Sequence, residues 1–221
     1  MGLDFGVIKE YLPLYKEALI LTVRIGWEGV LLALIIGVVC SAIVHFRVPI
    51  LKAFVSIYIE LFRNTPLLVQ LFFLFFALPK MGIKMSASVC GVLGIGLLGG
   101  AYMAETLRSG LDNIPNIQYE SAASLGMSKF QAMRYIIFPQ AVTSSVPGLV
   151  ANVIFLLKET SVFSTISLMD LMFTAKDLIG MYAKTIECLV LLVVFYLIML
   201  LPVSILGSVL ERRLRYAEFG H

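Results

Sequence analysis

The sequence predicts an all-α integral membrane protein with five transmembrane helices and a short polar helix pair on the cytoplasmic side. Of its 221 residues, 60% are hydrophobic and only 14% are charged, whereas a soluble domain is about half apolar. Apolar stretches of about 20 residues are long enough to cross a bilayer as helices, and a chain in lipid must form helices or a closed barrel. The apolar runs are continuous and do not alternate at every second residue, which favours helices.

The predicted spans belong to one membrane domain over residues 1–221. They cover residues 18–45, 53–78, 86–107, 142–157 and 187–206. A polar segment over residues 116–140 separates the third span from the fourth. No internal repeat divides the chain, and five spans are too few for inverted repeats within one chain. A transport pathway would therefore need a second copy or a relative.

The orientation follows from the basic residues of the loops. Because the number of spans is odd, the two ends of the chain lie on opposite faces. Cytoplasmic loops carry an excess of Lys and Arg, and here every loop arginine falls on one side: Arg47, Arg108, Arg134, Arg212, Arg213 and Arg215. The loops of the other side carry only lysines. We therefore expect the polar segment and the C-terminus in the cytoplasm and the N-terminus outside.

The composition argues against several other classes of site. A net charge of +3 gives no case for nucleic-acid binding. Cys40, Cys90 and Cys188 fall inside or at the edges of apolar runs without a CxxC spacing. We interpret them as small core residues, not as a disulfide or a metal site. The first apolar run is long and lacks a basic leader, so we expect it to be a retained span.

The segment "YESAASLGMSKFQAMRYIIFPQA" predicts two short helices that meet at a glycine. Glu120–Leu125 has an acidic start and small residues that suit a helix, and Gly126 supplies the left-handed residue that ends one. Ser128 and Gln131 have the spacing of a capping box that starts a second helix. Pro139 should break or kink that helix just before the fourth span. From helix signals alone, the pair either joins two spans or docks a soluble partner.

The same segment resembles the "EAA" signature of permease subunits in bacterial ABC importers, E-A-A-x3-G-x9-I-x-L-P. The matching residues are Glu120, Ser121, Ala122, Gly126, Ile136, Phe138 and Pro139. Ser121 replaces the first alanine and Phe138 replaces the leucine, and both are modest departures. Two further blocks resemble the polar amino-acid branch of that family, "IELFRNTPLLVQLFFLFFALP" at residues 59–79 and "AYMAETLRSGLDNIP" at residues 101–115.

The resemblance implies the permease fold of type I ABC importers and uptake of a polar L-amino acid such as glutamine, glutamate, arginine or histidine. It implies a bacterial cytoplasmic membrane, a second permease subunit, an external amino-acid-binding protein and a separate ABC ATPase dimer. This chain has no G-x4-GK[ST] run. ATP and Mg are therefore expected on the ATPase, with no cofactor and no catalytic residue here. The implied ATPase-docking residues are Glu120, Ser121, Ala122, Gly126, Met127, Phe130 and Pro139.

Two other classes of protein fit the sequence less well. A membrane-embedded enzyme would need a cluster such as H-E-x-x-H or Ser/His/Asp on facing helices. The only histidines are His45, in a loop, and His221, at the terminus. A homo-oligomeric channel would place rings of like residues at its pore, but a channel has no reason to carry an ATPase-docking segment.

"ELFRNTP" at residues 60–66 predicts a break within the second span. Glu60 and Arg63 have the spacing of a pair on one helix face. Asn64 or Thr65 is expected to cap a new helix with Pro66 at its first position. Broken helices at membrane depth tend to line cavities, and an ordinary kink on the cytoplasmic side is the equal alternative.

Polar residues end the fourth span in "NVIFLLKETSVFSTIS". One interpretation is a solvated external end with Lys158 extended toward water. The other is a lining for a zwitterionic substrate, because hydroxyls and a carboxylate satisfy an ammonium group. The resemblance places amino-acid contacts at a matching K-[DE]-[ST]-[ST] stretch. It implies substrate contacts led by Glu159 and including Asn152, Lys158, Thr160 and Ser161.

Three further patterns predict local structure. Arg24 and Glu28, four residues apart, are expected to pair on an amphipathic extension of the first helix. Gly96 and Gly100 form a GxxxG pair, which indicates close helix packing. A capping box from Ser167 to Asp170 should open an external helix that ends near Tyr182. We expect that helix to carry its charges, Asp170, Lys176 and Asp177, on a wet side.

Overall fold

The computed structural model describes residues 4–45 and 49–219, with side chains to residue 214, and this part of the chain contains no strand. Arg47 and His221 therefore lie outside the described residues. The long helices are α1 (Phe5–His45), α2 (Pro49–Arg63), α4 (Ala87–Asp112), α7 (Phe138–Glu159) and α9 (Thr185–Phe219). The short elements are α3 (Leu67–Phe72), η1 (Phe73–Ala77), η2 (Leu78–Met81), α5 (Asn116–Ser124), α6 (Lys129–Ala132), η3 (Met133–Ile137), η4 (Thr160–Ile166) and α8 (Leu171–Tyr182).

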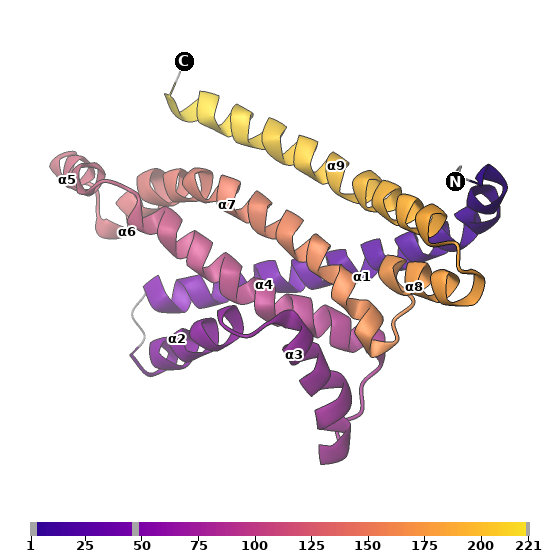
Figure 1. The fold of residues 1–221 in the computed structure, drawn as a ribbon. Coiled ribbons are helices and arrows are strands. Elements are labelled where there is room, and N and C mark those ends of the chain that lie inside the picture. The colour runs from indigo at the N-terminus through magenta and orange to yellow at the C-terminus, as the bar shows by residue number, and fades with distance from the viewer. Residues whose placement is uncertain (1–3, 46–48, 220–221) are drawn as a thin grey trace.

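Four helical runs of the described chain are long and apolar enough to cross a membrane by themselves. They contain α1, α4, α7 and α9, and they overlap the first, third, fourth and fifth predicted spans. The second predicted span is a bent pair: α2 and the run from Leu67 to Met81 meet at 105°. Counted as one span, this pair brings the total to five. Figure 1 shows the second part of the pair leaving the line of α2 and pointing away from the other helices.

Helix α4 occupies the middle of the bundle and packs on α1, α7 and α2 (Figure 1). Its glycines allow this close approach. A Cβ on Gly96 would collide with Leu32 of α1, and a Cβ on Gly100 would lie 2.5 Å from a methyl of Ile36. The predicted packing role of the GxxxG pair is therefore confirmed. The surface it meets belongs to α1 of the same chain.

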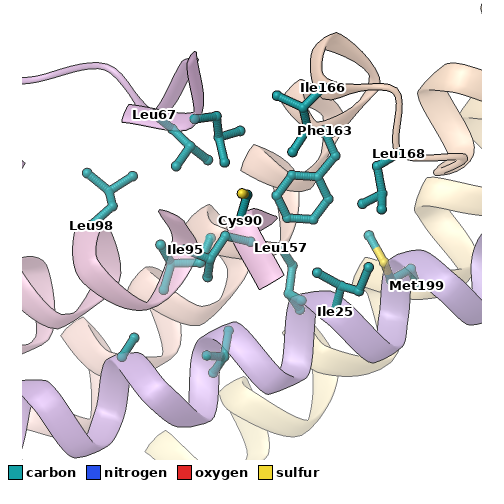
Figure 2. Packing of buried hydrophobic residues seen from close by; sticks show 14 of the residues in the cluster. Ile25, Leu67, Cys90, Ile95, Leu98, Leu157, Phe163, Ile166, Leu168 and Met199 are labelled. Atoms are coloured by element: carbon teal, nitrogen blue, oxygen red, sulfur yellow. The ribbon is translucent and has the colours of Figure 1, made fainter. Parts of the chain in front are cut away.

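The main apolar core joins helices that are far apart in sequence. Figure 2 shows Cys90 of α4 beside Phe163 of η4, with Leu157 of α7, Ile25 of α1 and Met199 of α9 in the same cluster. All five side chains are buried. Burying a large apolar side chain contributes about 1.5–3 kcal/mol, so this cluster holds four spans together.

A second core lies where the N-terminal part of α1 packs against α8 and the start of α9. Tyr15 is fully buried there, and its hydroxyl donates to the carbonyl oxygen of Cys188 at 2.7 Å. Helix α1 begins well before the predicted first span, because this part of it packs on α8 and α9 instead of extending freely. The predicted pair on α1 is present: Arg24 Nε donates to Glu28 Oε1 at 2.9 Å, with both side chains exposed.

The two ends of the chain lie at opposite ends of the bundle. In Figure 1 the N-terminus and α8 are at one end, while α5, α6 and the C-terminal end of α9 lie toward the other. Elements at these two ends are expected to lie on opposite faces of a membrane. The helix pair α5–α6 extends beyond the spans on the C-terminal side.

The helix predicted to break or kink at Pro139 is not broken there. Helical structure is continuous from Lys129 to Ile166, through α6, η3, α7 and η4. The π-helical turn η3 precedes the proline, and Phe138 N–H bonds to the carbonyl of Met133, one residue farther back than in an α-helix. Such a turn is a known cause of bending. The turn shifts the backbone hydrogen-bond pattern just before Pro139, which lacks an N–H. The second helix of the pair therefore continues into the fourth span.

The predicted capping box at Ser167 is also wrong. Ser167 is left-handed, with φ of 58°, and ends η4. Helix α8 begins after Asp170, whose Oδ1 accepts from Phe173 N–H at 2.9 Å. Asp170 is fully buried, not on a wet side, because it is held in the contact of α8 with α1 and α9. Lys176 and Asp177 are exposed as expected, and the helix ends at Tyr182.

Candidate coupling turn and membrane-embedded polar residues

In the turn between α5 and α6, backbone hydrogen bonds end α5 and side-chain hydrogen bonds begin α6. Gly126 has φ of +75°. The N–H groups of Gly126 and Met127 donate to the carbonyls of Ala123 and Ala122 at 2.9 and 3.1 Å. This pair of backbone hydrogen bonds is the pattern that ends helices at a left-handed glycine. Ser128 then opens α6 with a complete capping box to Gln131, so the predicted cap residues are both present.

Large apolar side chains are exposed on this turn. Leu125 is 80% exposed and Phe130 is 76% exposed. Exposed apolar residues that gather in one place mark interaction sites. Ala122 is fully buried and Met127 is half-buried, whereas Glu120, Ser121 and Pro139 are exposed. The predicted docking residues from Glu120 to Phe130 therefore share this turn, with Ala122 packed inside, whereas Pro139 lies in α7.

The coupling turn, which we define as residues 116–132, is tied to the ends of two spans. Ile114, Ile137 and Ala141 form a small buried cluster that joins the end of α4 to η3 and α7. Gln140 Nε2 donates to Gln118 Oε1 at 3.4 Å, which links α7 to α5. The turn is therefore linked to α7 by a side-chain hydrogen bond, and the end of α4 packs against η3 and α7 beside it.

The break between α2 and α3 lies at Asn64–Pro66, where the sequence predicts it, but its caps differ from the prediction. Asn64 Nδ2 donates back to the Glu60 carbonyl at 2.7 Å, and Thr65 Oγ1 donates back to the Leu61 carbonyl at 2.7 Å. Both side chains complete the end of α2, and neither caps α3. Pro66 is itself the residue before the first turn of α3 and makes no side-chain cap bond.

The expected pair between Glu60 and Arg63 is absent from the described structure. The guanidinium of Arg63 lies 5.5 Å from the ring centre of Tyr102, over its face. Tyr102 belongs to α4, so this contact holds the end of α2 against the central helix. Glu60 instead accepts from Asn64 Nδ2 at 3.1 Å.

Gln70 also supports the break, and sequence reasoning missed it. Its Nε2 donates to the carbonyls of Phe62 and Thr65 at 3.2 and 2.9 Å, which joins α3 to the end of α2. Gln70 is buried in the apolar run "LLVQLFF". A lone amide in such a run was the available signal, because polar residues within spans are expensive and need partners.

The polar residues near the end of α7 point to different neighbours. Asn152 Nδ2 donates to Thr106 Oγ1 of α4 at 2.9 Å. Thr160 is fully buried, and its hydroxyl donates to the Leu157 carbonyl at 2.7 Å. Glu159 is half-exposed, and among the described residues its carboxylate has no hydrogen-bond or ion-pair partner. Lys158 is exposed and Ser161 is half-buried.

A multi-span helical bundle with a capped helix pair projecting beyond its spans is the architecture of a multi-pass membrane subunit. The family described as "Binding-protein-dependent transport system inner membrane component" matches residues 29–216, and the chain belongs to this family. It is thus a multi-pass membrane permease subunit.

Relatives and one solved structure agree with this assignment. The chain is 32% identical to the probable amino-acid permease protein YxeN of Bacillus subtilis, over 95% of each chain. It is 33% identical to the probable glutamine ABC transporter permease protein GlnP of the same species, over 79% of this chain and 80% of the relative. A crystal structure of an amino acid ABC transporter with histidines aligns with a TM-score of 0.90 at 33% identity, covering 96% of this chain and all of that one. The fold is that of type I ABC importer permeases.

Proposed function

We propose that this chain is the non-catalytic transmembrane subunit of an ATP-driven importer that passes a polar L-amino acid into the cytoplasm. Its partners are an ABC ATPase dimer, a second permease subunit and an external amino-acid-binding protein. ATP and Mg belong to the ATPase. The glutamine and amino-acid transport named for the relatives supports the substrate class.

The observation that carries the proposal is the coupling turn. Two cap motifs fix its shape, and Leu125 and Phe130 present apolar side chains beyond the membrane spans. An ATPase needs such a preformed contact, because a loop that had to be ordered on binding would cost additional free energy. The hydrogen bond between Gln118 and Gln140 of α7, together with the buried cluster of Ile114, Ile137 and Ala141 that flanks the turn, would pass ATPase movement to the spans.

The substrate contact proposed at the end of α7 centres on Glu159. Its carboxylate has no partner in the described chain and is half-exposed, so it is available to an ammonium group. Ser161 and Lys158 are also accessible. Asn152 and Thr160 each already donate a hydrogen bond within the chain, so in this proposal they shape the site.

The proposed orientation places α5, α6 and the C-terminal end of α9 in the cytoplasm and the N-terminus outside. The loop arginines support this choice. Cysteines introduced at Lys9 and Arg212, in a chain whose three native cysteines are replaced, test it with a membrane-impermeant thiol reagent on intact cells. Lys9→Cys should react and Arg212→Cys should not. The reverse pattern would invert the topology and remove the ATPase from the coupling turn.

The proposal is tested by purification and transport. The tagged chain, expressed with its ATPase, should co-purify with it, and proteoliposomes with the binding protein should take up one or more radiolabelled polar amino acids. Leu125→Ser and Phe130→Ser should reduce recovery of the ATPase at least tenfold. Met181→Ser is the matched control, because Met181 is 66% exposed at the opposite end of the bundle. Equal recovery with all three variants would refute docking at the coupling turn.

A further inference from the structure

Helix α8 lies at the N-terminal end of the bundle and has a strained residue at each end (Figure 1). Ser167 precedes it with φ of 58°, and Ala183 follows it with φ of 54°. No other non-glycine residue in the described part of the chain has positive φ. The left-handed region is unfavourable for residues with a Cβ, and such strain persists only where surrounding contacts enforce it. Contacts made by α8 itself must therefore hold it in place.

The contacts that hold α8 are one apolar face and one hydrogen bond from its first turn. Leu171, Ala175 and Leu178 are buried in the cluster that joins α8 to α1 and α9. The N–H of Leu171 donates to Thr22 Oγ1 of α1 at 3.1 Å. The other residues of the helix are exposed or half-buried. Helix α8 is thus attached along one side only, and its first turn lies deepest in the bundle.

A carboxyl group is buried at that attached end. Asp170, the cap of α8, is fully buried. Its Oδ1 accepts from Phe173 N–H at 2.9 Å, but no donor among the described residues reaches its Oδ2. Burial of a charge without a full set of partners is costly and favours the neutral form, and burial raises the pKa of this carboxyl to about 7. In the packed structure the carboxyl therefore keeps a proton in mildly acidic solution.

The elements around Asp170 bring no buried cation to it. From α9 it is faced by Tyr196, a neutral side chain whose hydroxyl also has no partner among the described residues. Helix η4 contains no titratable residue. The charged residues of this part of α1 and of α8 are all exposed: Lys16, Glu17, Arg24, Lys176 and Asp177. Only loss of the packing itself would let the ionised carboxylate reach water.

We infer that α8 is a proton-controlled latch, which packs on α1 and α9 while Asp170 carries a proton and separates from them when the proton passes to water. Opening releases one proton, leaves a hydrated carboxylate and relieves the strain at Ser167 and Ala183. The latch itself does not depend on transport. Its place on the outer face, where external pH would act on it, rests on the proposed function and orientation. Because α8 also contacts η4, which follows Glu159, opening would free the segment beside the proposed substrate contact.

The sign of the pH dependence follows from the two states of the carboxyl. The closed state binds the proton more tightly than the open state, so low pH favours closure. Opening should increase as pH rises between the ordinary aspartate pKa of about 4 and the pKa of the closed form, about 7. One proton changes the opening equilibrium by at most about tenfold per pH unit.

Thiol labelling of the purified chain in complex with its ATPase measures the opening. In the chain without native cysteines, Ala175→Cys places a thiol on the buried face of α8. Gly180→Cys places one on its exposed side, where a Cβ meets nothing within 4 Å. The ratio of their rates with N-ethylmaleimide cancels the pH dependence of the reagent. We expect this ratio to rise at least fivefold from pH 5 to pH 7, and less than twofold with Asp170→Asn, because an amide has no proton to lose.

Three further variants show where the opening occurs. Ala18→Cys, buried on the face of α1 that meets α8, should follow Ala175→Cys. Ala33→Cys, buried where α1 packs on Gly99 of α4, should stay unreactive over the whole range. Asp177→Asn, which removes an exposed carboxylate of α8, should keep the full rise at Ala175→Cys.

Each contrary outcome has one meaning. A flat ratio in the chain that keeps Asp170 would overturn the latch, whatever the variants do. An equal rise with Asp170→Asn would show that another group titrates, and a parallel rise at Ala33→Cys would show that the whole bundle loosens. Either result also overturns the inference. Failure of the proposed function is distinguishable, because it would appear as absent uptake while α8 still opens with pH.

Discussion

The backbone N–H of Met127 donates to the carbonyl of Ala122 at 3.1 Å, across the left-handed Gly126. This bond closes the end of α5, and the capping box of Ser128 opens α6 one residue later. The direction of α6 relative to α5 is therefore set by backbone geometry. A docking element of this kind depends on one residue that tolerates positive φ.

Replacing Gly126 by valine should weaken coupling to the ATPase. A Cβ at Gly126 would meet nothing within 4 Å, so the cost comes from the backbone alone, about 1–2 kcal/mol for a residue forced into the left-handed region. We expect the variant to reach the membrane but to lose transport-linked stimulation of the ATPase. Gly126→Asn should retain more of it, because asparagine visits this region more readily.

Gly180→Val is the matched control for that experiment. Gly180 also has open space around its Cβ position but no positive φ, and it lies in α8 at the other end of the bundle. Normal coupling in Gly126→Val, or equal losses in both variants, would contradict the docking role.

Gly37→Ala should destabilise the contact of α1 with α4. The added methyl would lie 2.6 Å from Cβ of Met103 and 3.1 Å from the backbone nitrogen of Ala104. Neither atom can be moved away by a change of side-chain rotamer. Overpacking of this kind typically costs about 1–3 kcal/mol. Thermal unfolding of the purified chain should show a lower midpoint for Gly37→Ala than for Gly180→Ala. A midpoint equal to that of the wild type would contradict the prediction, because it would mean that α1 and α4 can move apart to accept the methyl at no cost in stability.

The sequence predicted best the features that neighbouring residues determine. The left-handed Gly126 and the capping box from Ser128 to Gln131 depend on a few consecutive residues, and both are present. The break at residues 64–66 was also predictable, because proline lacks the N–H that a continuing helix needs. Its capping was not predictable, because Asn64 and Thr65 bond equally well to a preceding carbonyl or a following N–H.

Features determined by distant parts of the chain could not be predicted in this way. Thr22 Oγ1 accepts from Leu171 N–H at 3.1 Å, although the two residues are far apart in the sequence. Asp170 is buried beside this contact. Its charge and capping position suggest a solvated residue, and only the packing of α8 on α1 and α9 reverses that expectation. The hydrogen bond of Asn152 was likewise not predictable from neighbouring residues, because its partner Thr106 lies on another span.

The stability of the chain should depend on pH through Asp170. Burial raises the pKa of this carboxyl from 3.8 to about 7, although backbone hydrogen bonds, led by that from Phe173, oppose the shift. Between about pH 4 and pH 7 the folded carboxyl therefore keeps a proton that the unfolded chain has lost. The free energy of unfolding should fall as pH rises through this window, by at most about 1.4 kcal/mol per pH unit from this group.

Asp170→Asn should flatten that dependence while preserving the helix cap, because asparagine caps as well as aspartate. Thermal unfolding of the purified chain between pH 5 and pH 7.5 measures the effect. Asp177→Asn, which removes an exposed carboxylate of the same helix, should leave the wild-type slope. Parallel slopes for the wild type and Asp170→Asn would show that the carboxyl titrates as an exposed group.

Glu159→Gln should lower amino-acid uptake strongly while the complex still assembles. The carboxylate ends a membrane-spanning helix, is half-exposed and has no partner in the described chain, and an ionisable residue in that position is a candidate for function. Truncating one partner of a buried charged hydrogen bond typically costs about 2–5 kcal/mol, so the apparent affinity should fall at least tenfold. Glu17→Gln, which removes an exposed carboxylate of α1, is the control. Glu120→Ala and Pro139→Ala should give the opposite pattern, with assembly or coupling reduced. If Glu159→Gln transports with wild-type rate and affinity, Glu159 is only a solvated helix end, and substrate recognition lies elsewhere on the path.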